Sequence, residues 1–127
     1  MKRRNGFTLI ELLAVIIILA VIALIATPIV LNVVDSAKKS AAESSAKGFA
    51  DAARLHYIEN EFKQTSDPTN YTKLASAQVS AITVQGEAPK TCTSVTYGSN
   101  GEVNFTGCEW GGYTFNCSNG NVTAASK

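Results

Sequence analysis

The chain has 127 residues, 46% of them hydrophobic, and a formal net charge of +1 from eleven Lys and Arg against ten Asp and Glu. This length suits one small domain, and the balanced charge excludes the broad basic surface of a nucleic-acid-binding protein. The chain has one histidine and lacks a phosphate-binding loop, a His-Glu-x-x-His motif and a nucleophile elbow, so we expect neither an enzyme nor a cofactor.

The N-terminus joins a basic leader to a long apolar segment. Residues 2–4 are Lys-Arg-Arg, a positive charge that predicts a cytoplasmic N-terminus, and residues 12–34 carry no ionisable side chain. About 20 apolar residues are enough for a helix to cross a bilayer. Glu11 stands at the start of this segment, where an unpaired carboxylate costs on the order of a few kcal/mol, so we expect it to have a partner.

The candidate cleavage position is Gly6, which precedes the apolar segment, whereas a conventional secretory signal is cut after its apolar core. A protease that cut after Gly6 would leave the apolar segment attached and create a new amino group on Phe7. One helical turn separates that amine from Glu11, so the two charges could neutralise each other within a chain or between packed neighbours. Eight Lys and Arg would then remain against ten acids.

Both features also have simpler explanations. The apolar segment could be a signal anchor that tethers an unrelated domain, with Glu11 hydrated near the interface, although such an anchor requires neither the glycine nor the acid. Pro28 could merely kink a spanning helix, because it removes the hydrogen bond to the carbonyl of Leu24 and its ring crowds that carbonyl. Neighbouring helices can accommodate such a break.

The N-terminal residues resemble the class III signal of type IV prepilins, which type IV pilins share with the pseudopilins of secretion and DNA-uptake machines. The matching residues are the basic leader, Gly6, Phe7 and Glu11, and the resemblance continues through residues 12–16 to Pro28. It implies cleavage after Gly6 and N-methylation of Phe7 by a prepilin peptidase. It also implies that Glu11 pairs with the amine of a neighbouring subunit during assembly.

One residue departs from the family pattern. Family members usually have a glycine upstream of the helix proline, where this chain has Ala20. Local melting of the helix between that position and Pro28, which occurs in some family filaments, is therefore less expected here.

The resemblance also implies a function and partners. We expect a structural subunit of a type IV pilus-like filament; the alternatives are a pseudopilin of a type II secretion or competence machine and, from another class, a non-assembling membrane-anchored binding domain. The implied partners are copies of the chain and other pilins, a membrane platform, an assembly ATPase and the cytoplasmic membrane, with no direct nucleic-acid binding. The implied location is a single pass through a bacterial cytoplasmic membrane with the N-terminus inside, then an extracellular or periplasmic filament.

Helical periodicity continues beyond the apolar segment, and a helix is predicted from Phe7 to about Phe62, with an end near residues 64–68. Two rows of mostly small residues recur at helical spacing: Ala37, Ala41, Gly48, Ala52, Leu55 and Phe62, and beside them Ala42, Ala46, Phe49, Ala53 and Tyr57. Small residues on several sides allow close approach by several neighbours, which suits a helix shared between its own domain and a filament core. The alternative is that the rows form the packing face of one domain.

A small antiparallel sheet is predicted after the helix. Residues 81–84 read as a short strand, and stronger strands are expected at 91–97, 102–106 and 113–117, separated by Ser99-Asn100-Gly101 and Gly111-Gly112, with Asn119-Gly120 beyond. Three or four strands packed on the helix give an α+β, pilin-like fold. The expected divisions are a leader at 1–6, a membrane and filament-core half of the helix at 7–34, and a globular domain at 35–127. Among the aromatics, which on a small sheet are more often core, Trp110 beside two glycines is the one most expected to be an exposed contact.

The three cysteines all lie in the predicted sheet region. If residues 99–101 form a three-residue hairpin loop, Cys92 falls opposite Cys108, and this is the preferred disulfide. Cys108 with Cys117, across the Gly-Gly turn, is the alternative, and spacing alone leaves the connectivity open. The cysteines lack the close pairing of structural zinc motifs and His56 lies on the helix, so we expect no metal site and assign His56 to the helix surface or to packing.

Overall fold

The computed structural model describes residues 5–65 and 76–127. Its elements are a long helix α1 (Leu9–Thr65), strand β1 (Ser76–Ala77), a 3₁₀ helix η2 (Val79–Ala81), and strands β2 (Ser94–Tyr97), β3 (Val103–Trp110), β4 (Tyr113–Ser118) and β5 (Asn121–Ser126). The chain divides into two compact units, residues 1–37 and 38–127. A long apolar helix followed by a small antiparallel sheet confirms the predicted α+β class.

In the first unit, α1 begins at Leu9, two residues later than predicted. Pro28 lies inside the helix and does not end it. At the preceding residue, the Thr27 hydroxyl donates a 2.6 Å hydrogen bond to the carbonyl of Ala23, an i−4 contact that favours local bending of a helix. No side chain from residue 9 to residue 37 is buried within the chain. Within the described residues, α1 is the one helix long and apolar enough to cross a membrane.

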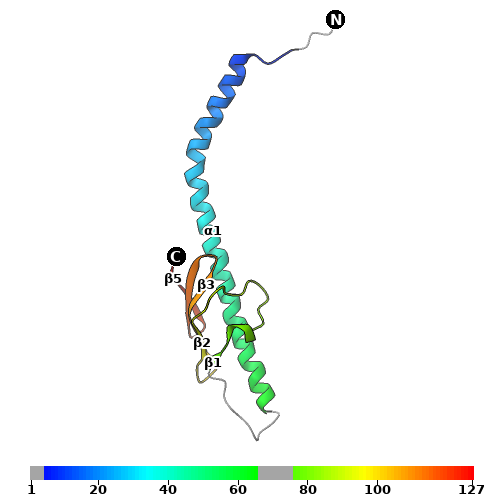
Figure 1. Ribbon diagram of the computed structural model, residues 1–127, viewed down its shortest axis with the longest axis vertical. Coiled ribbons are helices and arrows are strands. Elements are labelled where there is room, and N and C mark those ends of the chain that lie inside the picture. Colours follow the sequence, from blue (N-terminus) through cyan, green and yellow to red (C-terminus); the bar gives the residue numbers. More distant parts are fainter. Residues whose placement is uncertain (1–4, 66–75) are drawn as a thin grey trace. The chain divides into compact units, whose positions relative to one another are not determined.

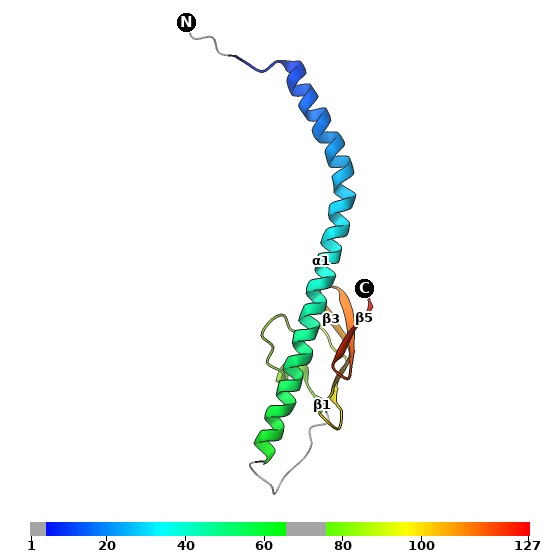
Figure 2. The same ribbon diagram turned by 180° about the vertical axis from the view of Figure 1, so that it is seen from behind.

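In the second unit, the sheet is an antiparallel meander in the order β1-β2-β3-β4-β5. The strands lie along one side of the later part of α1, as both ribbon views show (Figures 1 and 2). The described residues form five strands, against the three or four predicted, because the two-residue β1 pairs with β2 and because β5 follows the turn at Asn119-Gly120. The predicted helix end is only partly covered, since residues 66–68 lie outside the described residues.

The strand predicted at residues 81–84 is wrong. Val79–Ala81 form the 3₁₀ helix η2, and the three residues after it are irregular. Ile82 is buried in the core, with only 6% of its surface exposed. The short apolar run therefore reflects the burial of one side chain, and sequence patterns of this length do not distinguish that from strand pairing.

The hairpin between β2 and β3 has the predicted loop. Gly98 and Glu102 are joined by a 2.7 Å bond from the Gly98 N–H to the Glu102 carbonyl, and Tyr97 pairs with Val103. The three residues between them are Ser99, Asn100 and Gly101. Gly101 has a φ of +80°, and a Cβ there would lie 2.7 Å from the ring of Tyr57. Only glycine avoids both the backbone strain and the contact with the helix.

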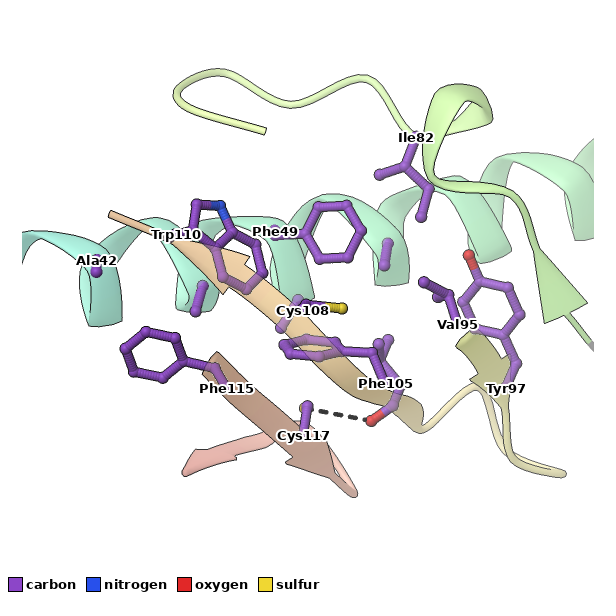
Figure 3. Packing of buried hydrophobic residues seen from close by; sticks show 14 of the residues in the cluster. Ala42, Phe49, Ile82, Val95, Tyr97, Phe105, Cys108, Trp110, Phe115 and Cys117 are labelled. Carbon is purple, nitrogen blue, oxygen red and sulfur yellow. Dashed lines mark hydrogen bonds between the residues drawn. The ribbon is translucent and has the colours of Figure 1, made fainter. Parts of the chain in front are cut away.

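The two rows of α1 differ in their burial. The second row, from Ala42 to Tyr57, is buried against the sheet, whereas in the first row Leu55 and Phe62 are 58% and 71% exposed. The sheet contributes the other core side chains shown in Figure 3: Val95, Tyr97, Phe105, Cys108, Trp110, Phe115 and Cys117. The packing-face explanation therefore holds for the second row, whereas the first row is mostly exposed, with Ala52 partly buried against the core.

Trp110 corrects the expectation of an exposed aromatic contact. It is 1% exposed, and its ring centroid lies 5.6 Å from that of Phe49 and 6.0 Å from that of Phe115, both in edge-to-face geometry. The neighbouring Gly111 and Gly112 have φ values of +58° and +83°, so they provide the β3–β4 turn. The glycines beside the tryptophan reflect the demands of that turn and give no information about exposure.

Candidate processing and assembly site

The first turn of α1 is closed by reciprocal hydrogen bonds between Thr8 and Glu11. The Thr8 hydroxyl accepts from the Glu11 N–H at 3.3 Å, and the Glu11 carboxylate lies 3.4 Å from both the N–H and the hydroxyl of Thr8. The Thr8 carbonyl accepts the first helical bond, from the N–H of Leu12 at 3.2 Å. This is the capping box, in which an N-cap threonine and a glutamate three residues later satisfy each other's backbone donors.

Thr8 is a functional candidate that the sequence reasoning missed. The signal was present as Thr-x-x-Glu directly before an apolar run, which is the sequence signature of a helix N-terminus. A lone acid beside an apolar run points first to an ion pair, and here the same residue also completes the cap. The side-chain hydrogen bonds of Glu11 within the described part of the chain go to Thr8.

The predicted cleavage position lies just outside the helix. Residues 5–8 have no helical structure, and the Phe7 side chain is 90% exposed. A Cβ built on Gly6 would have no heavy atom within 4 Å. The fold of the chain therefore has no need for glycine at this position, and any such need has to come from a partner that binds this segment.

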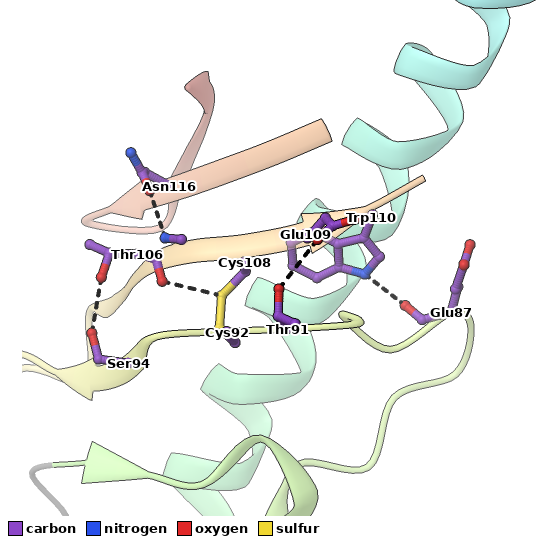
Figure 4. Close-up of a disulfide and its surroundings, with 10 residues drawn as sticks. Glu87, Thr91, Cys92, Ser94, Thr106, Cys108, Glu109, Trp110 and Asn116 are labelled. Atoms are coloured by element: carbon purple, nitrogen blue, oxygen red, sulfur yellow. Dashed lines mark hydrogen bonds between the residues drawn. A yellow bond between two sulfur atoms is a disulfide. The ribbon is translucent and has the colours of Figure 1, made fainter. Parts of the chain in front are cut away.

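The three cysteines belong to the second unit, with Cys108 on β3, Cys117 on β4 and Cys92 just before β2. The structure joins Cys92 to Cys108 in a disulfide (Figure 4). The hairpin register accounts for this pairing, because Cys92 lies two residues before Ser94 and Cys108 lies two residues after Thr106, the partner of Ser94 on β3. Cys117 is a buried free thiol that donates to the Val103 carbonyl at 3.4 Å. Burial raises the pKa of the Cys117 thiol. The alternative pair, Cys108 with Cys117, is not formed.

The segment before β2 is also held by polar contacts on β3. The N–H of Lys90 donates to the Glu109 carbonyl at 2.8 Å, and the N–H of Glu109 donates to the Thr91 carbonyl at 2.9 Å. These two bonds continue the contact with β3 as far as residue 90, although Lys90 and Thr91 both bond to Glu109 and the one-to-one register of the hairpin is not kept there. The disulfide lies between these bonds and β2, so the segment before β2 is attached to β3 at several points.

His56 takes part in a hydrogen-bonded group on the side of α1. Its Nδ1 lies 3.2 Å from the Tyr97 hydroxyl, and its Nε2 lies 3.2 Å from the side-chain amide nitrogen of Asn60. Burial raises the pKa of Tyr97 to about 12. His56 is therefore a packing residue with both ring nitrogens engaged. In the described ranges, no three His, Cys, Asp or Glu side chains are grouped to hold a metal ion.

Comparisons with known proteins agree with the N-terminal geometry. Residues 1–27 match the family model described as the prokaryotic N-terminal methylation motif. The chain is also 34% identical over 59 residues to the type II secretion system core protein G of Pseudomonas aeruginosa. The matched segment covers 46% of this chain and 42% of that relative, less than half the length of either. No solved structure matches the chain.

These observations define a chain that carries a prepilin signal: a basic leader, a glycine before an exposed phenylalanine, and a capped acid at the start of an apolar helix. The family model and the relative both support a relationship to the type IV pilin and pseudopilin family. That family is structural, and its N-terminal motif implies processing by a prepilin peptidase and assembly with other pilins.

Proposed function

We propose that this protein is a structural subunit of a type IV pilus-like filament, cleaved after Gly6 and assembled through its N-terminal helix. The observation that supports this most directly is the helix segment 12–34, which has no charge and no buried side chain. Such a surface requires lipid or other apolar helices around it. The acid at its start then marks the place where assembly is controlled.

Cleavage supplies the cation that Glu11 lacks. Hydrolysis of the Gly6–Phe7 bond consumes one water, leaves a carboxylate on Gly6, and leaves an ammonium group on Phe7. N-methylation of that amine by the peptidase keeps its positive charge. In the assembled state, Glu11 pairs with the Phe7 amine of a neighbouring subunit, because two opposite charges are tolerated in an apolar environment only when they are paired.

The remaining parts have separate tasks in this proposal. Residues 1–6 are the cytoplasmic leader, 7–34 move from the membrane into the filament core, and 35–127 form the outer domain. A membrane platform and an assembly ATPase extract the subunits from the cytoplasmic membrane. In the first row of α1, Leu55 is exposed and Gly48 has open space beside it, so this part of the helix is available to neighbouring helices.

A pseudopilin is the second candidate, and one specific observation favours it. The matched relative is named as a core protein of the type II secretion system. In that case the chain forms a short filament within a secretion or DNA-uptake machine and does not reach the cell surface. The third candidate, a non-assembling anchored domain, requires that the leader persists and that Glu11 is replaceable.

Mass spectrometry of the N-terminal peptide separates these candidates. The peptide is compared between material sheared from the cell surface and the membrane fraction. A peptide that begins at N-methylated Phe7 in the sheared material supports a surface filament. The same peptide confined to membranes supports the pseudopilin, and an intact Met1 leader in both fractions overturns the proposal.

A further inference from the structure

We propose that Thr8 is a positioning residue for cleavage of the Gly6–Phe7 bond, because its cap holds that bond outside the helix. This inference rests on the proposed function and adds a residue to it. Thr8 stands directly after the two residues of the scissile bond, and α1 begins directly after Thr8. The N-cap bond from the Glu11 N–H to the Thr8 hydroxyl, at 3.3 Å, sets where the helix starts.

An apolar environment favours an earlier helix start. A backbone N–H group without a hydrogen-bond partner in lipid costs on the order of several kcal/mol, like other buried unpaired polar groups. A helix near the membrane therefore tends to extend toward its N-terminus, because extension gives more of these groups a partner. The next side chain upstream that can cap a helix is Asn5, and asparagine is as good an N-cap as threonine. A helix capped by Asn5 would contain both Gly6 and Phe7 in its first turn.

Two features oppose that extension. Gly6 is a poor helix former, and the Thr8 cap stabilises the later start. The carboxylate of Glu11 contributes the second half of the box by accepting from the Thr8 N–H. Because the Thr8 hydroxyl accepts from a backbone N–H, this cap survives when the Glu11 side chain is changed but is lost when the hydroxyl is removed.

The position of the helix start determines what fraction of the chains the peptidase can bind. A protease binds the extended backbone around a scissile bond, so only chains with the bond outside the helix are competent substrates. When the competent fraction falls, the apparent affinity falls by the same factor, and the rate from the bound complex is unchanged. Loss of the cap therefore appears in KM and leaves kcat as it was.

The matched variants are Thr8→Val, which has a similar shape without the hydroxyl, and Thr8→Ser, which keeps it. Full-length chains in proteoliposomes are cleaved with purified prepilin peptidase. We expect Thr8→Val to raise KM about fivefold, the size of a typical N-cap contribution, with kcat unchanged and with Thr8→Ser close to the wild type. An unchanged KM in Thr8→Val overturns the inference. A lower kcat with unchanged KM also overturns it, because Thr8 would then contact the peptidase during the reaction.

Amide hydrogen exchange on the uncleaved chain tests the cap without the peptidase. In Thr8→Val we expect slower exchange at Leu9 and Ile10, because a helix capped by Asn5 gives these two N–H groups the carbonyls of Asn5 and Gly6 as acceptors, and we expect wild-type behaviour in Thr8→Ser. Exchange at these amides that is the same in all three chains overturns the inference. Failure of the peptidase to cut even the wild-type chain would contradict the proposed function, while the exchange result would still decide where the helix starts.

Discussion

Trp110 donates its indole N–H to the backbone carbonyl of Glu87 at 2.9 Å, while its ring is buried against Phe49. One side chain thus joins the helix, the sheet and the irregular segment before β2 (Figure 4). The segment around Glu87 has no regular structure of its own, so its position depends on this bond, on the disulfide and on the pairing of Lys90 with Glu109.

Replacement of Trp110 tests this junction. We expect Trp110→Phe to lower the free energy of unfolding by about 2 kcal/mol, because the Glu87 carbonyl loses its donor and the smaller ring leaves a void. Chemical denaturation in detergent, followed by circular dichroism, measures the change. Phe115→Leu is a control that alters the same cluster without touching the hydrogen bond. A Trp110→Phe chain as stable as the wild type would show that the bond contributes nothing.

The cysteine arrangement predicts thiol reactivity. The folded chain should not react with iodoacetamide, the chain unfolded without reductant should react at one thiol, and the reduced, unfolded chain at three. Because burial raises the pKa of Cys117, its neutral form is favoured in the folded chain, and alkaline pH up to about 9 should accelerate labelling little. Labelling of two different cysteines before reduction would contradict the arrangement.

Removal of the disulfide tests its contribution to stability. The two cysteines are 16 residues apart. A loop of this length predicts a loss of about 3 kcal/mol when both are replaced, as in Cys92→Ser with Cys108→Ser. The loss is measured by denaturation under non-reducing conditions, with Cys117→Ala as the matched single change. Equal effects of the two replacements would show that the bridge is not the stabilising element.

One substitution in each row of α1 gives a matched test of assembly. Ala46 is fully buried against the sheet, whereas a Cβ at Gly48 would meet nothing within 4 Å. Ala46→Leu should destabilise the domain by about 1–3 kcal/mol through overpacking. Gly48→Leu should leave the domain at least as stable, because glycine is a poor helix former, and should lower filament yield by blocking close approach of a neighbouring helix. Stability is read from denaturation and yield from sheared filaments; normal yield from Gly48→Leu would exclude this face from assembly.

Two variants distinguish the capping contacts of Glu11 from its proposed pairing with the Phe7 amine. Glu11→Val should leave cleavage largely intact, since the Thr8 cap remains, and should impair assembly because the Phe7 amine loses its partner. Glu11→Gln keeps an oxygen that accepts from the Thr8 N–H but removes the charge, so assembly should also fall. Immunoblots of processed subunit and of sheared filaments give the two readouts. Normal filament yield from Glu11→Val would refute the proposed ion pair.

Substitutions at Gly6 test the proposed cleavage site. Because nothing in the chain surrounds this position, larger residues should not disturb folding, and any effect should come from the peptidase. We expect Gly6→Ala to be processed more slowly than the wild type and Gly6→Val to remain uncleaved. Electrophoretic mobility and mass of the N-terminal peptide report the processing. A fully processed Gly6→Val chain would place the cut elsewhere.

The hairpin and the aromatic cluster show where sequence reasoning succeeded and where it stopped. The loop at Ser99-Asn100-Gly101 was predictable because turn residues act through their own backbone preferences, and the loop length then determines the register of β2 on β3. The burial of Trp110 and the irregular backbone around Ile82 were not predictable in the same way. Both depend on which distant side chains fill the space around them.

The sequence by itself determined the features that are local along the chain. These are the leader and glycine before Phe7, the acid at the start of an uncharged helix, the Thr-x-x-Glu cap that was present but overlooked, and the turns of the sheet. Only the tertiary structure decided which row of α1 faces the sheet, where Trp110 finds its acceptor and which cysteine stays free. The reason is physical: spacing and turn chemistry act between residues close in sequence, whereas burial depends on the packing of segments that only the fold brings together.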